Sequence, residues 1–423
     1  MLQVNYIAKN REAVKEGLQK KFFTDLEKVD TIIELDDKRK RLKQSLDDNL
    51  ARQNSISKEI GQLFGQGKRE EAEQFKQRIP LLKEESKKLE EELETLEQQL
   101  YDNLVLLPNL PHSSVPDGKT PEHNLVMKGP DELPKLNPDA KSHWDLIEQY
   151  RIIDLALGTK ITGAGFPVYI GKGARLQRAL ISFFLDHATR AGYTEVIPPY
   201  MVNEDTAFGT GQLPDKEGQM YHMPLDKLYM IPTAEVPVTN IYRNEILSED
   251  ELPIKLCAYS PCFRREAGSY GKDVRGLNRV HQFDKVEIVQ FQRPEKSYET
   301  LEEMLAHVED LLKKLELPYR ILRLCGGDMS FSSALTYDFE VYSAAQERWL
   351  EVSSVSNFET FQSNRMKIRY RTGDKKTELV HTLNGSALAL PRIVAALLEN
   401  NQMPDGIKVP EALRAYTGFD FIK

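Results

Sequence analysis

The sequence predicts an α+β protein with an N-terminal antiparallel coiled-coil hairpin and a larger C-terminal domain. Two long segments within residues 32–100 repeat apolar residues every 3.5 positions, and a turn at Gly65 and Gly67 separates them. A proline-rich stretch from Pro108 to Pro138 then forbids long helices. After Ser142, helix-like and strand-like patterns are mixed. The expected parts are a coiled-coil arm over residues 1–107, a linker over residues 108–141 that packs on the next domain, and a C-terminal domain over residues 142–423.

Length and composition bound the class of protein. The chain has 423 residues, enough for two or three domains, and no apolar run reaches the roughly 18 residues that a membrane span needs. The N-terminus has no long apolar segment of the kind found in secretory signals. Three cysteines without paired CxxC motifs fit a reducing compartment and disfavour structural zinc, although a mixed Cys/His site stays open. We expect a cytoplasmic protein without membrane contact.

The first hairpin helix has an apolar seam with three polar interruptions. The seam residues are Ile32, Leu35, Arg39, Leu42, Leu46, Asn49, Gln53, Ile56, Ile60 and Leu63. In the second helix, which we expect from Ala72 to Leu100, only Ser86 breaks the seam, and Pro80 predicts a kink. The short glycine-containing turn favours one antiparallel hairpin over two separate coils.

Two uses of this hairpin are compatible with the sequence. Coiled coils most often serve oligomerisation. The first helix, however, carries a basic cluster between positions 38 and 43 that suits phosphates, although the net charge of −8 argues mildly against nucleic-acid binding. The cluster comprises Lys38, Arg39, Lys40, Arg41 and Lys43.

The stretch with the most candidate functional residues runs from Cys257 to Gln292. It reads as a strand, a polar loop from Ala267 to Gly276 and a second strand. Its cations suit a polyanion such as a triphosphate, because arginine binds phosphate oxygens in pairs. Phe283 suits stacking on a base. The cations are Arg264, Arg265, Lys272, Arg275, Arg279 and Lys285.

The order of residues in this stretch carries a resemblance. Phe-Arg-x-Glu, a glycine-bearing loop and then Arg-x-His-Gln-Phe-x-Lys-x-Glu resemble motif 2 of the class II aminoacyl-tRNA synthetases. The run His281–Glu287, HQFDKVE, is similar to the form found in the seryl-tRNA synthetase family. The resemblance implies a catalytic domain built on an antiparallel sheet flanked by helices, and a homodimer.

Further segments fit the same family in order. A helix over 174–192 followed by a strand over 193–202 resembles motif 1, with an ordinary edge strand as the alternative. Thr233-Ala234-Glu235 resembles the serine-binding loop, with a helix capped by Thr233 as the local alternative. We also expect strands over 337–341 and 349–354, and a helix over 297–316. The buried face of this helix would comprise Leu301, Met304, Leu305, Val308, Leu311, Leu312 and Leu315.

The last motif combines His381–Ser386 with a helix that we expect from Ala387 to Asn400. It resembles motif 3, in which an arginine, here Arg392, meets the γ-phosphate of ATP. Pro391 departs from the glycines common in the family, and proline is acceptable only near a helix N-terminus.

The resemblance implies ATP-dependent activation of L-serine and its transfer to tRNA(Ser), with tRNA(Sec) as a further substrate. It also implies that the helical arm over residues 1–107 binds the tRNA by reaching its long variable arm. The catalytic residues would be Arg264, Arg279 and Arg392. The serine site would comprise Thr233, Ala234, Glu235, Glu287 and Ser386. The ATP site would comprise Arg264, Arg265, Glu266, Val280, Phe283, Glu351, Val352, Ser353, Ser354 and Arg392. Glu351 and Ser354 would hold Mg²⁺ through ATP, since this ion prefers oxygen ligands.

Two rival interpretations remain open. One is a paralogue that charges a carrier protein, which the intact helical arm argues against. The other is a scaffold with an inactive synthetase fold, which the joint presence of Arg264, Glu287, Glu351 and Arg392 argues against.

Overall fold

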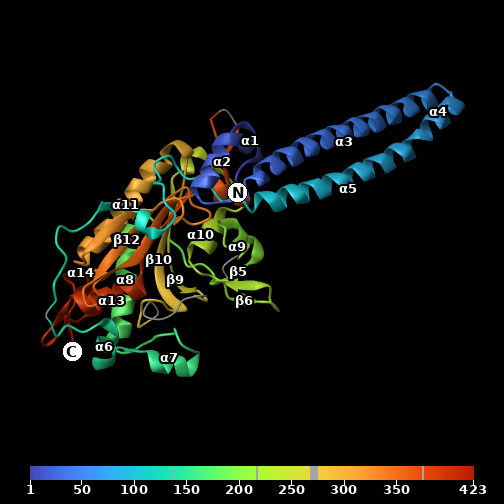
Figure 1. Cartoon of the computed structure of the whole chain (residues 1–423). Helices are drawn as coiled ribbons and strands as arrows, with labels where there is room; N and C mark the ends of the chain where they lie inside the picture. Colours follow the sequence, from blue (N-terminus) through green and yellow to red (C-terminus); the bar gives the residue numbers. More distant parts are fainter. Residues whose placement is uncertain (137, 216–217, 267–274, 374–375) are drawn as a thin grey trace. The chain divides into compact units, whose positions relative to one another are not determined.

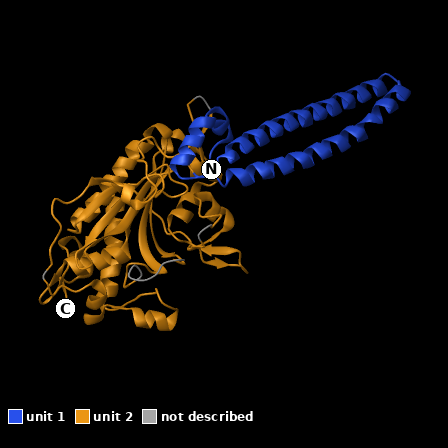
Figure 2. Cartoon of the chain, viewed as in Figure 1, with its two compact units in different colours: residues 1–108 blue, residues 109–423 orange. Residues whose placement is uncertain are grey.

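The computed structural model describes residues 1–423 apart from residues 137, 216–217, 267–274 and 374–375. The chain folds as two compact units, residues 1–108 and residues 109–423 (Figure 2). The first unit is helical and the second mixes helices with an antiparallel-rich sheet, so the predicted α+β class is confirmed. Within the described parts of the chain, no helix is long and apolar enough to cross a membrane.

The first unit is dominated by a helical hairpin (Figure 1). Helix α3 (Glu27–Gly65) runs out and α5 (Arg78–Leu104) returns beside it, with the short α4 (Arg69–Lys76) at the turn. Two short helices, α1 (Val4–Lys9) and α2 (Arg11–Lys20), pack on α3 and bury Ile7, Val14 and Leu18. The hairpin predicted from the apolar spacing is therefore present.

The returning limb of the hairpin is interrupted at Gln77, three residues before Pro80. Proline has no N–H to donate to the carbonyl four residues earlier, and its ring clashes with that carbonyl. For Pro80 that residue is Lys76, where α4 ends. The kink expected at Pro80 is thus realised as a break between α4 and α5.

Three of the four polar interruptions of the two seams, Asn49, Gln53 and Ser86, meet each other. Gln53 Nε2 donates to Ser86 Oγ (2.7 Å), and Ser86 Oγ donates to Asn49 Oδ1 (3.0 Å). Asn49 Nδ2 donates across the hairpin to Glu85 Oε2 (2.7 Å), and Gln53 Nε2 reaches the Leu82 carbonyl (3.1 Å). A shift of register would leave these buried groups without partners, so this layer specifies how the helices align.

The second unit is organised on an eight-stranded sheet in the order β1-β11-β12-β13-β16-β10-β9-β4. Neighbouring strands are antiparallel except β4 and β9, which are parallel. In that order, the strands are β1 (Leu125–Lys128), β11 (Tyr319–Arg323), β12 (Leu335–Ser343), β13 (Arg348–Asn357), β16 (His381–Ala389), β10 (Gln282–Gln292), β9 (Ile254–Phe263) and β4 (Thr194–Glu195).

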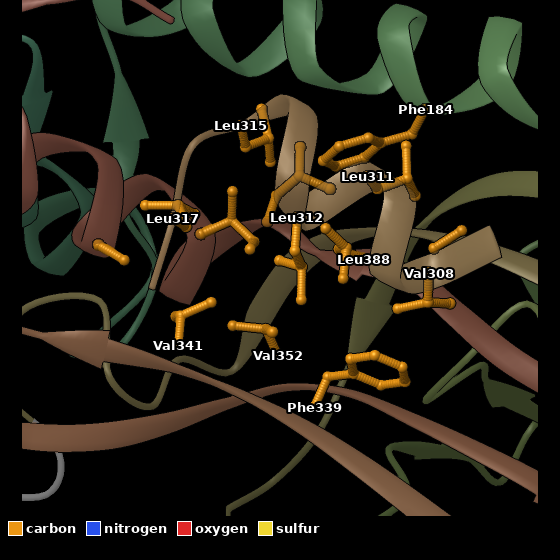
Figure 3. Close-up of a cluster of buried hydrophobic side chains, with 14 of the residues drawn as sticks. Phe184, Val308, Leu311, Leu312, Leu315, Leu317, Phe339, Val341, Val352 and Leu388 are labelled. Carbon is orange, nitrogen blue, oxygen red and sulfur yellow. The ribbon is translucent and has the colours of Figure 1, made fainter. Parts of the chain in front are cut away.

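Three long helices, α8 (Lys172–Arg190), α11 (Ser297–Lys314) and α13 (Leu390–Asn400), pack on this sheet. Figure 3 shows Phe184 of α8 and Leu311 of α11 close to Leu388 of β16 in the core. All seven apolar residues predicted for the buried face of α11 are buried: Leu301, Met304, Leu305, Val308, Leu311, Leu312 and Leu315. Each such side chain stabilises the fold by roughly 1.5–3 kcal/mol.

Smaller elements complete the second unit. The helices are α6 (His143–Gln149), α7 (Leu155–Ile161), α9 (Glu204–Thr210), α10 (Glu235–Thr239), α12 (Phe361–Met366) and α14 (Glu411–Thr417). The short strands are β2 (Ile153–Asp154), β3 (Val168–Tyr169), β5 (Met201–Asn203), β6 (His222–Met223), β7 (Leu228–Met230), β8 (Ile246–Ser248), β14 (Arg369–Arg371), β15 (Thr377–Leu379), β17 (Gln402–Met403), β18 (Gly406–Lys408) and β19 (Phe421–Ile422).

Three boundaries differ from those expected. The proline-rich stretch contains β1, an edge strand of the main sheet, where we expected only a linker. The strand expected over 193–202 is two short strands, β4 and β5, in different sheets, because Pro198 and Pro199 lie between them. The helix expected from Ala387 begins at Leu390, because β16 continues to Ala389 and Pro391 fits only a first helical turn.

Candidate active site

The sheet register brings distant predicted residues together. Glu287 on β10 lies opposite Ser386 on β16 and opposite Ala258 on β9. Two of the residues predicted for the serine site are thus neighbours on one sheet although 99 positions separate them. Most of the loop expected between Ala267 and Gly276, including Lys272, lies outside the described residues.

A buried polar pocket forms around Glu287. Its Oε2 atom accepts hydrogen bonds from Lys285 Nζ (2.7 Å) and from Thr233 Oγ1 (3.1 Å). Thr233 Oγ1 also accepts from the backbone N–H of Glu235 (3.2 Å), so the local cap and the pocket contact coexist. Ala234 is fully buried beside them. Four of the residues predicted for serine, together with Lys285, therefore line one small region.

Glu235 is the second buried carboxylate of this region. Gln362 Nε2 donates to its Oε1 atom (2.7 Å), and Gln362 is itself held by Thr382 Oγ1 (2.7 Å). Burial, reinforced by the negative charge of Glu287, raises the pKa of Glu235 to about 7. A cationic group placed beside Glu235 would stabilise its ionised form.

The three arginines predicted for phosphate converge. Arg279 Nη1 lies 2.7 Å from Glu266 Oε2, and Arg392 donates to the carbonyls of Asn278 (3.0 Å) and Glu351 (2.8 Å). Burial lowers the pKa of Arg392, and the positive charges of Arg279 and Arg264 lower it further, while Glu351 opposes them. Cations close enough to repel one another in this way would be neutralised by a polyphosphate.

The Arg264 guanidinium lies over the ring of Phe283, with Cζ 5.2 Å from the ring centroid. An aromatic face beside a guanidinium suits a nucleobase, which could stack on either group. Arg265 is exposed and lies over Tyr221 instead, with its Cζ 5.7 Å from that ring centroid. Val280 is buried next to this site.

The four positions predicted for ATP on strand β13, residues 351–354, have different surroundings. Ser354 Oγ lies 3.4 Å from Glu351 Oε1, and half of the Glu351 side chain is exposed. Ser353 Oγ donates to the carbonyl of Ser386 (2.6 Å), and Val352 belongs to the hydrophobic core (Figure 3). Only Glu351 and Ser354 therefore offer side-chain oxygens from this strand to a ligand.

Sequence reasoning did not select several residues of this region. Lys285 was noted only as a cation, although its ion pair with Glu287 is almost fully buried. Asp338 lies opposite Ser354, and its buried Oδ1 atom makes no hydrogen bond within the described part of the structure. Burial and the charge of Glu351 raise the pKa of Asp338. The remaining omissions are Gln362, which holds Glu235, and Thr382, which holds Gln362, as described above.

Comparisons with known proteins agree with this geometry. Residues 1–111 match the seryl-tRNA synthetase N-terminal domain, and residues 221–401 match the tRNA synthetase class II core domain (G, H, P, S and T). The chain is 53% identical to the serine–tRNA ligase of Salinibacter ruber, covering 99% of this chain and 98% of that protein. It is 52% identical to that of Chlorobaculum parvum, covering 100% of both.

Solved structures show the same similarity. The seryl-tRNA synthetase of Pyrococcus horikoshii, complexed with ATP, superposes with a TM-score of 0.92 at 35% identity, covering 100% of this chain and 99% of that one. The cytoplasmic serine–tRNA ligase of Naegleria fowleri, in complex with AMP, gives 0.88 at 28% identity with the same coverage.

Proposed function

The chain belongs to the seryl-tRNA synthetase family of class II aminoacyl-tRNA synthetases and ligates serine to tRNA(Ser), and we propose that the site described above carries out the reaction with ATP. The observation that supports this most directly is the convergence of three arginines beside a pocket with two buried carboxylates.

The reaction has two steps. A serine carboxylate oxygen attacks the α-phosphorus of ATP, the bond from that phosphorus to the β-bridging oxygen breaks, and pyrophosphate leaves with the electron pair. A hydroxyl at the 3′ end of the tRNA then attacks the carbonyl carbon, and AMP leaves. Neither step requires a nucleophile from the protein, so catalysis consists of positioning and charge neutralisation.

The residues divide these tasks. Arg264 grips the α-phosphate and the serine carboxylate, Arg392 binds the γ-phosphate, and Arg279 holds the polyphosphate. Phe283 stacks on adenine, with Glu266 nearby. The remaining ATP contacts come from Arg265, Val280, Val352 and Ser353, and for Val352 and Ser353 only the backbone is available, since their side chains are buried.

The serine pocket matches the three polar groups of the substrate. Glu287 has one oxygen held by Lys285 and Thr233, which leaves Oε1 to accept a hydrogen bond from the serine hydroxyl. Glu235 suits the ammonium group. Ser386 lies opposite Glu287 on the neighbouring strand and forms a further part of the lining of the serine pocket.

The donors near Glu351 fit Mg²⁺. Glu351 and Ser354 supply oxygens, and the unpartnered Oδ1 of Asp338 points to a missing cationic or donor group. Among the described residues no group of three metal-binding His, Cys, Asp or Glu side chains exists, so ATP phosphates and water would complete the shell, as is usual for Mg²⁺. The ion would neutralise phosphate charge.

We further propose that the enzyme is a cytoplasmic homodimer, that the hairpin of α3 and α5 binds tRNA(Ser), and that tRNA(Sec) is also serylated where it exists. Amino-acid-dependent exchange between ATP and pyrophosphate, run across all twenty amino acids, tests the proposal. Exchange with serine well above that with any other amino acid is the expected result. Faster exchange with another amino acid than with serine, or no exchange at all, would refute it.

Arginine at position 264 is expected to be irreplaceable by lysine. An Arg264→Lys enzyme should lose about 10²-fold in the rate of serine-dependent exchange, because an ammonium binds an oxyanion at one point only and cannot stack on Phe283 in the same way. Arg320→Lys is the matched control, since Arg320 also lies over a ring, that of Trp349 (4.7 Å). Equal rates in both variants would contradict the role of Arg264.

The raised pKa of Glu235 predicts a pH dependence. Below about pH 7 the carboxyl is protonated and cannot pair with the serine ammonium, so kcat/KM for serine should fall as pH decreases from 8 to 6. The kcat/KM for ATP, measured over the same range, should lack this step. A profile for serine that stays flat down to pH 6 would show that Glu235 does not bind the ammonium as a carboxylate.

A further inference from the structure

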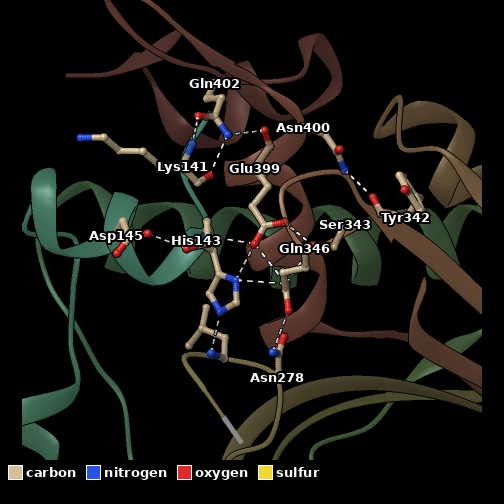
Figure 4. A network of polar contacts seen from close by, with 12 residues as sticks. Lys141, His143, Asp145, Asn278, Tyr342, Ser343, Gln346, Glu399, Asn400 and Gln402 are labelled. Carbon is tan, nitrogen blue, oxygen red and sulfur yellow. Dashed lines mark hydrogen bonds and ion pairs between the residues drawn. The ribbon is translucent and has the colours of Figure 1, made fainter. Parts of the chain in front are cut away.

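A buried histidine–carboxylate pair, His143 and Glu399, joins α6 to α13, the helix that carries Arg392 (Figure 4). His143 begins α6, Glu399 lies near the end of α13, and both side chains are fully buried. His143 Nδ1 is 2.7 Å from Glu399 Oε1, and the backbone N–H of His143 donates to the same oxygen (2.9 Å). Ser343 Oγ donates to the other oxygen. Burial raises the pKa of Glu399, but these hydrogen bonds outweigh it and hold the pKa below its usual value.

The contacts fix the tautomer of His143. The backbone N–H of Leu277 donates to His143 Nε2 (2.9 Å), so Nε2 carries a lone pair and no proton. The proton of the neutral ring is therefore on Nδ1, from which it is donated to Glu399. The imidazole acts as a bridge: it accepts from the chain just after the motif 2 loop and donates to the helix that carries Arg392.

A second bridge runs parallel to the first. Gln346 Nε2 donates to Glu399 Oε1 (3.1 Å), and Gln346 Oε1 accepts from Asn278 Nδ2 (2.9 Å). The carbonyl of Asn278 in turn accepts from Arg392 Nε (3.0 Å). Arg392 and Glu399 are two turns apart on α13. Asn278 is therefore held from both ends of one helix face, directly by Arg392 and through Gln346 by Glu399, while Leu277 is linked to Glu399 through His143.

The loop end is closely fitted to this bridge. Gly276 has φ +66°, and a Cβ atom there would lie 2.2 Å from His143 Nε2, so only glycine lets the chain pass the imidazole. The guanidinium of Arg275 lies over the ring of Trp144, 4.4 Å from its centroid. Helix α6 thus provides the support on which the C-terminal end of the motif 2 loop rests.

We propose that His143 is a positioning residue for ATP: with Glu399 and Gln346 it fixes Leu277 and Asn278, and through them it sets the orientation of Arg392 and of the adjacent Arg279. This inference rests on the proposed binding of ATP phosphates by those two arginines. Within the described structure, no hydrogen bond or ion pair joins the bridge to the residues proposed for serine, so losing the bridge should affect ATP and leave serine unaffected.

Two variants of similar size separate the halves of the bridge. The amide of His143→Gln reaches the place of Nε2, where its oxygen accepts from Leu277. The amide of His143→Asn reaches the place of Nδ1, so it still donates to Glu399 but leaves the Leu277 N–H without an acceptor. In pyrophosphate exchange, His143→Asn should raise KM for ATP about tenfold, the ratio that corresponds to ~1.4 kcal/mol. In His143→Gln, KM for ATP should stay close to that of the unmodified enzyme, because the Leu277 N–H keeps an acceptor. In both variants, KM for serine should differ from that of the unmodified enzyme by no more than about twofold.

Controls distinguish positioning from lost stability. His307→Gln and His307→Asn remove another buried imidazole, on α11, and should lower Tm without changing either KM. Gln346→Met removes the second bridge at constant volume and should raise KM for ATP several-fold. Unchanged KM for ATP in both His143→Asn and Gln346→Met, or equal increases for ATP and serine, would overturn the inference. If the unmodified enzyme showed no serine-dependent exchange, the proposed function itself would be refuted.

Discussion

The Glu287→Ala substitution is expected to reduce serine activation by about 10⁴-fold. The unmodified enzyme is likewise expected to activate the amino acid alanine about 10⁴-fold more slowly than serine. The two effects have one origin. A site built to accept a hydrogen bond from a substrate hydroxyl discriminates strongly against an analogue without it, because a buried polar group is then left without a partner.

The contacts of Glu287 explain why its carboxylate suits this role. Lys285 and Thr233 both bond to Oε2, which fixes the plane of the carboxylate. Among the described residues, Oε1 makes no hydrogen bond and can receive the substrate. Threonine differs from serine by a methyl group only, so its exclusion depends on size, a weaker filter of roughly 10- to 200-fold.

The experiment has to separate catalysis from folding. Glu287→Ala leaves the Lys285 ammonium buried without its partner, which costs about 3–5 kcal/mol of stability. Glu287→Gln keeps an oxygen acceptor and the side-chain volume, and should retain more serine activation than alanine does. Glu309→Ala is the control. Like Glu287, Glu309 receives hydrogen bonds from a lysine and from a hydroxyl group, here that of Tyr319, but it lies on α11 and is not proposed to bind serine.

Pyrophosphate exchange with serine and with alanine, measured together with Tm, distinguishes lost recognition of the serine hydroxyl from lost stability. Glu287→Ala should bind ATP normally when folded. If the unmodified enzyme activated alanine nearly as well as serine, Glu287 would not recognise the hydroxyl.

The local patterns of the sequence were sufficient for the long helices and strands, while most short elements of the second unit, such as α9, α12 and β14, were not predicted. The 3.5-residue spacing predicted α3 and α5, and the 3.6-residue spacing of α11 selected its buried side correctly, because both patterns are set by residues adjacent on one helix. Even the polar breaks in the seams were visible. That Asn49, Gln53 and Ser86 bond to one another was not, since it depends on the alignment of two helices.

The residues that sequence reasoning missed are held by partners far along the chain. Gln362 meets Glu235 across 127 positions, and His143 meets Glu399 across 256. Such pairs follow from the order and register of the strands, which no local pattern encodes. The resemblance supplied the residues that face the ligands, and the structure adds those that hold them in place.

The remaining large effect concerns the hairpin. Deleting residues 43–92, with a short flexible join, should leave serine-dependent pyrophosphate exchange largely intact and sharply reduce charging of tRNA(Ser). Every residue proposed for ATP or serine lies in residues 109–423, a separate compact unit. The register set by Asn49–Glu85 and Gln53–Leu82 places Leu42 opposite Leu93, so the cut keeps the two limbs level.

The deletion avoids the buried base of the hairpin. Ile32 is fully buried and Leu100 nearly so, and removing them would expose the surface against which α1 and α2 pack. A shortened hairpin therefore tests the function of the limbs without unfolding the unit. Discrimination against tRNAs without a long variable arm should also decrease, because the limbs are the part proposed to contact it.

The basic cluster on α3 refines this test. Asp36 pairs with Arg39 (2.7 Å) and with Lys40 (2.6 Å), and Lys43 pairs with Asp47 (3.4 Å). Within the described structure, Lys38 and Arg41 have no carboxylate at ion-pairing distance, so they are the members of the cluster available to phosphate.

Replacing both Lys38 and Arg41 by alanine should weaken tRNA binding and reduce the slope of log affinity against log salt by about 1.5–2, because each phosphate contact releases a condensed counterion. Lys87 and Lys88 on α5 are matched controls, since each pairs with a glutamate four residues away. If the shortened enzyme charged tRNA(Ser) as well as the full chain does, the limbs beyond Leu42 would serve structure or oligomerisation. The deletion keeps Lys38 and Arg41, so these two residues are tested separately: an unchanged salt slope in their double variant would show that they do not contact phosphate.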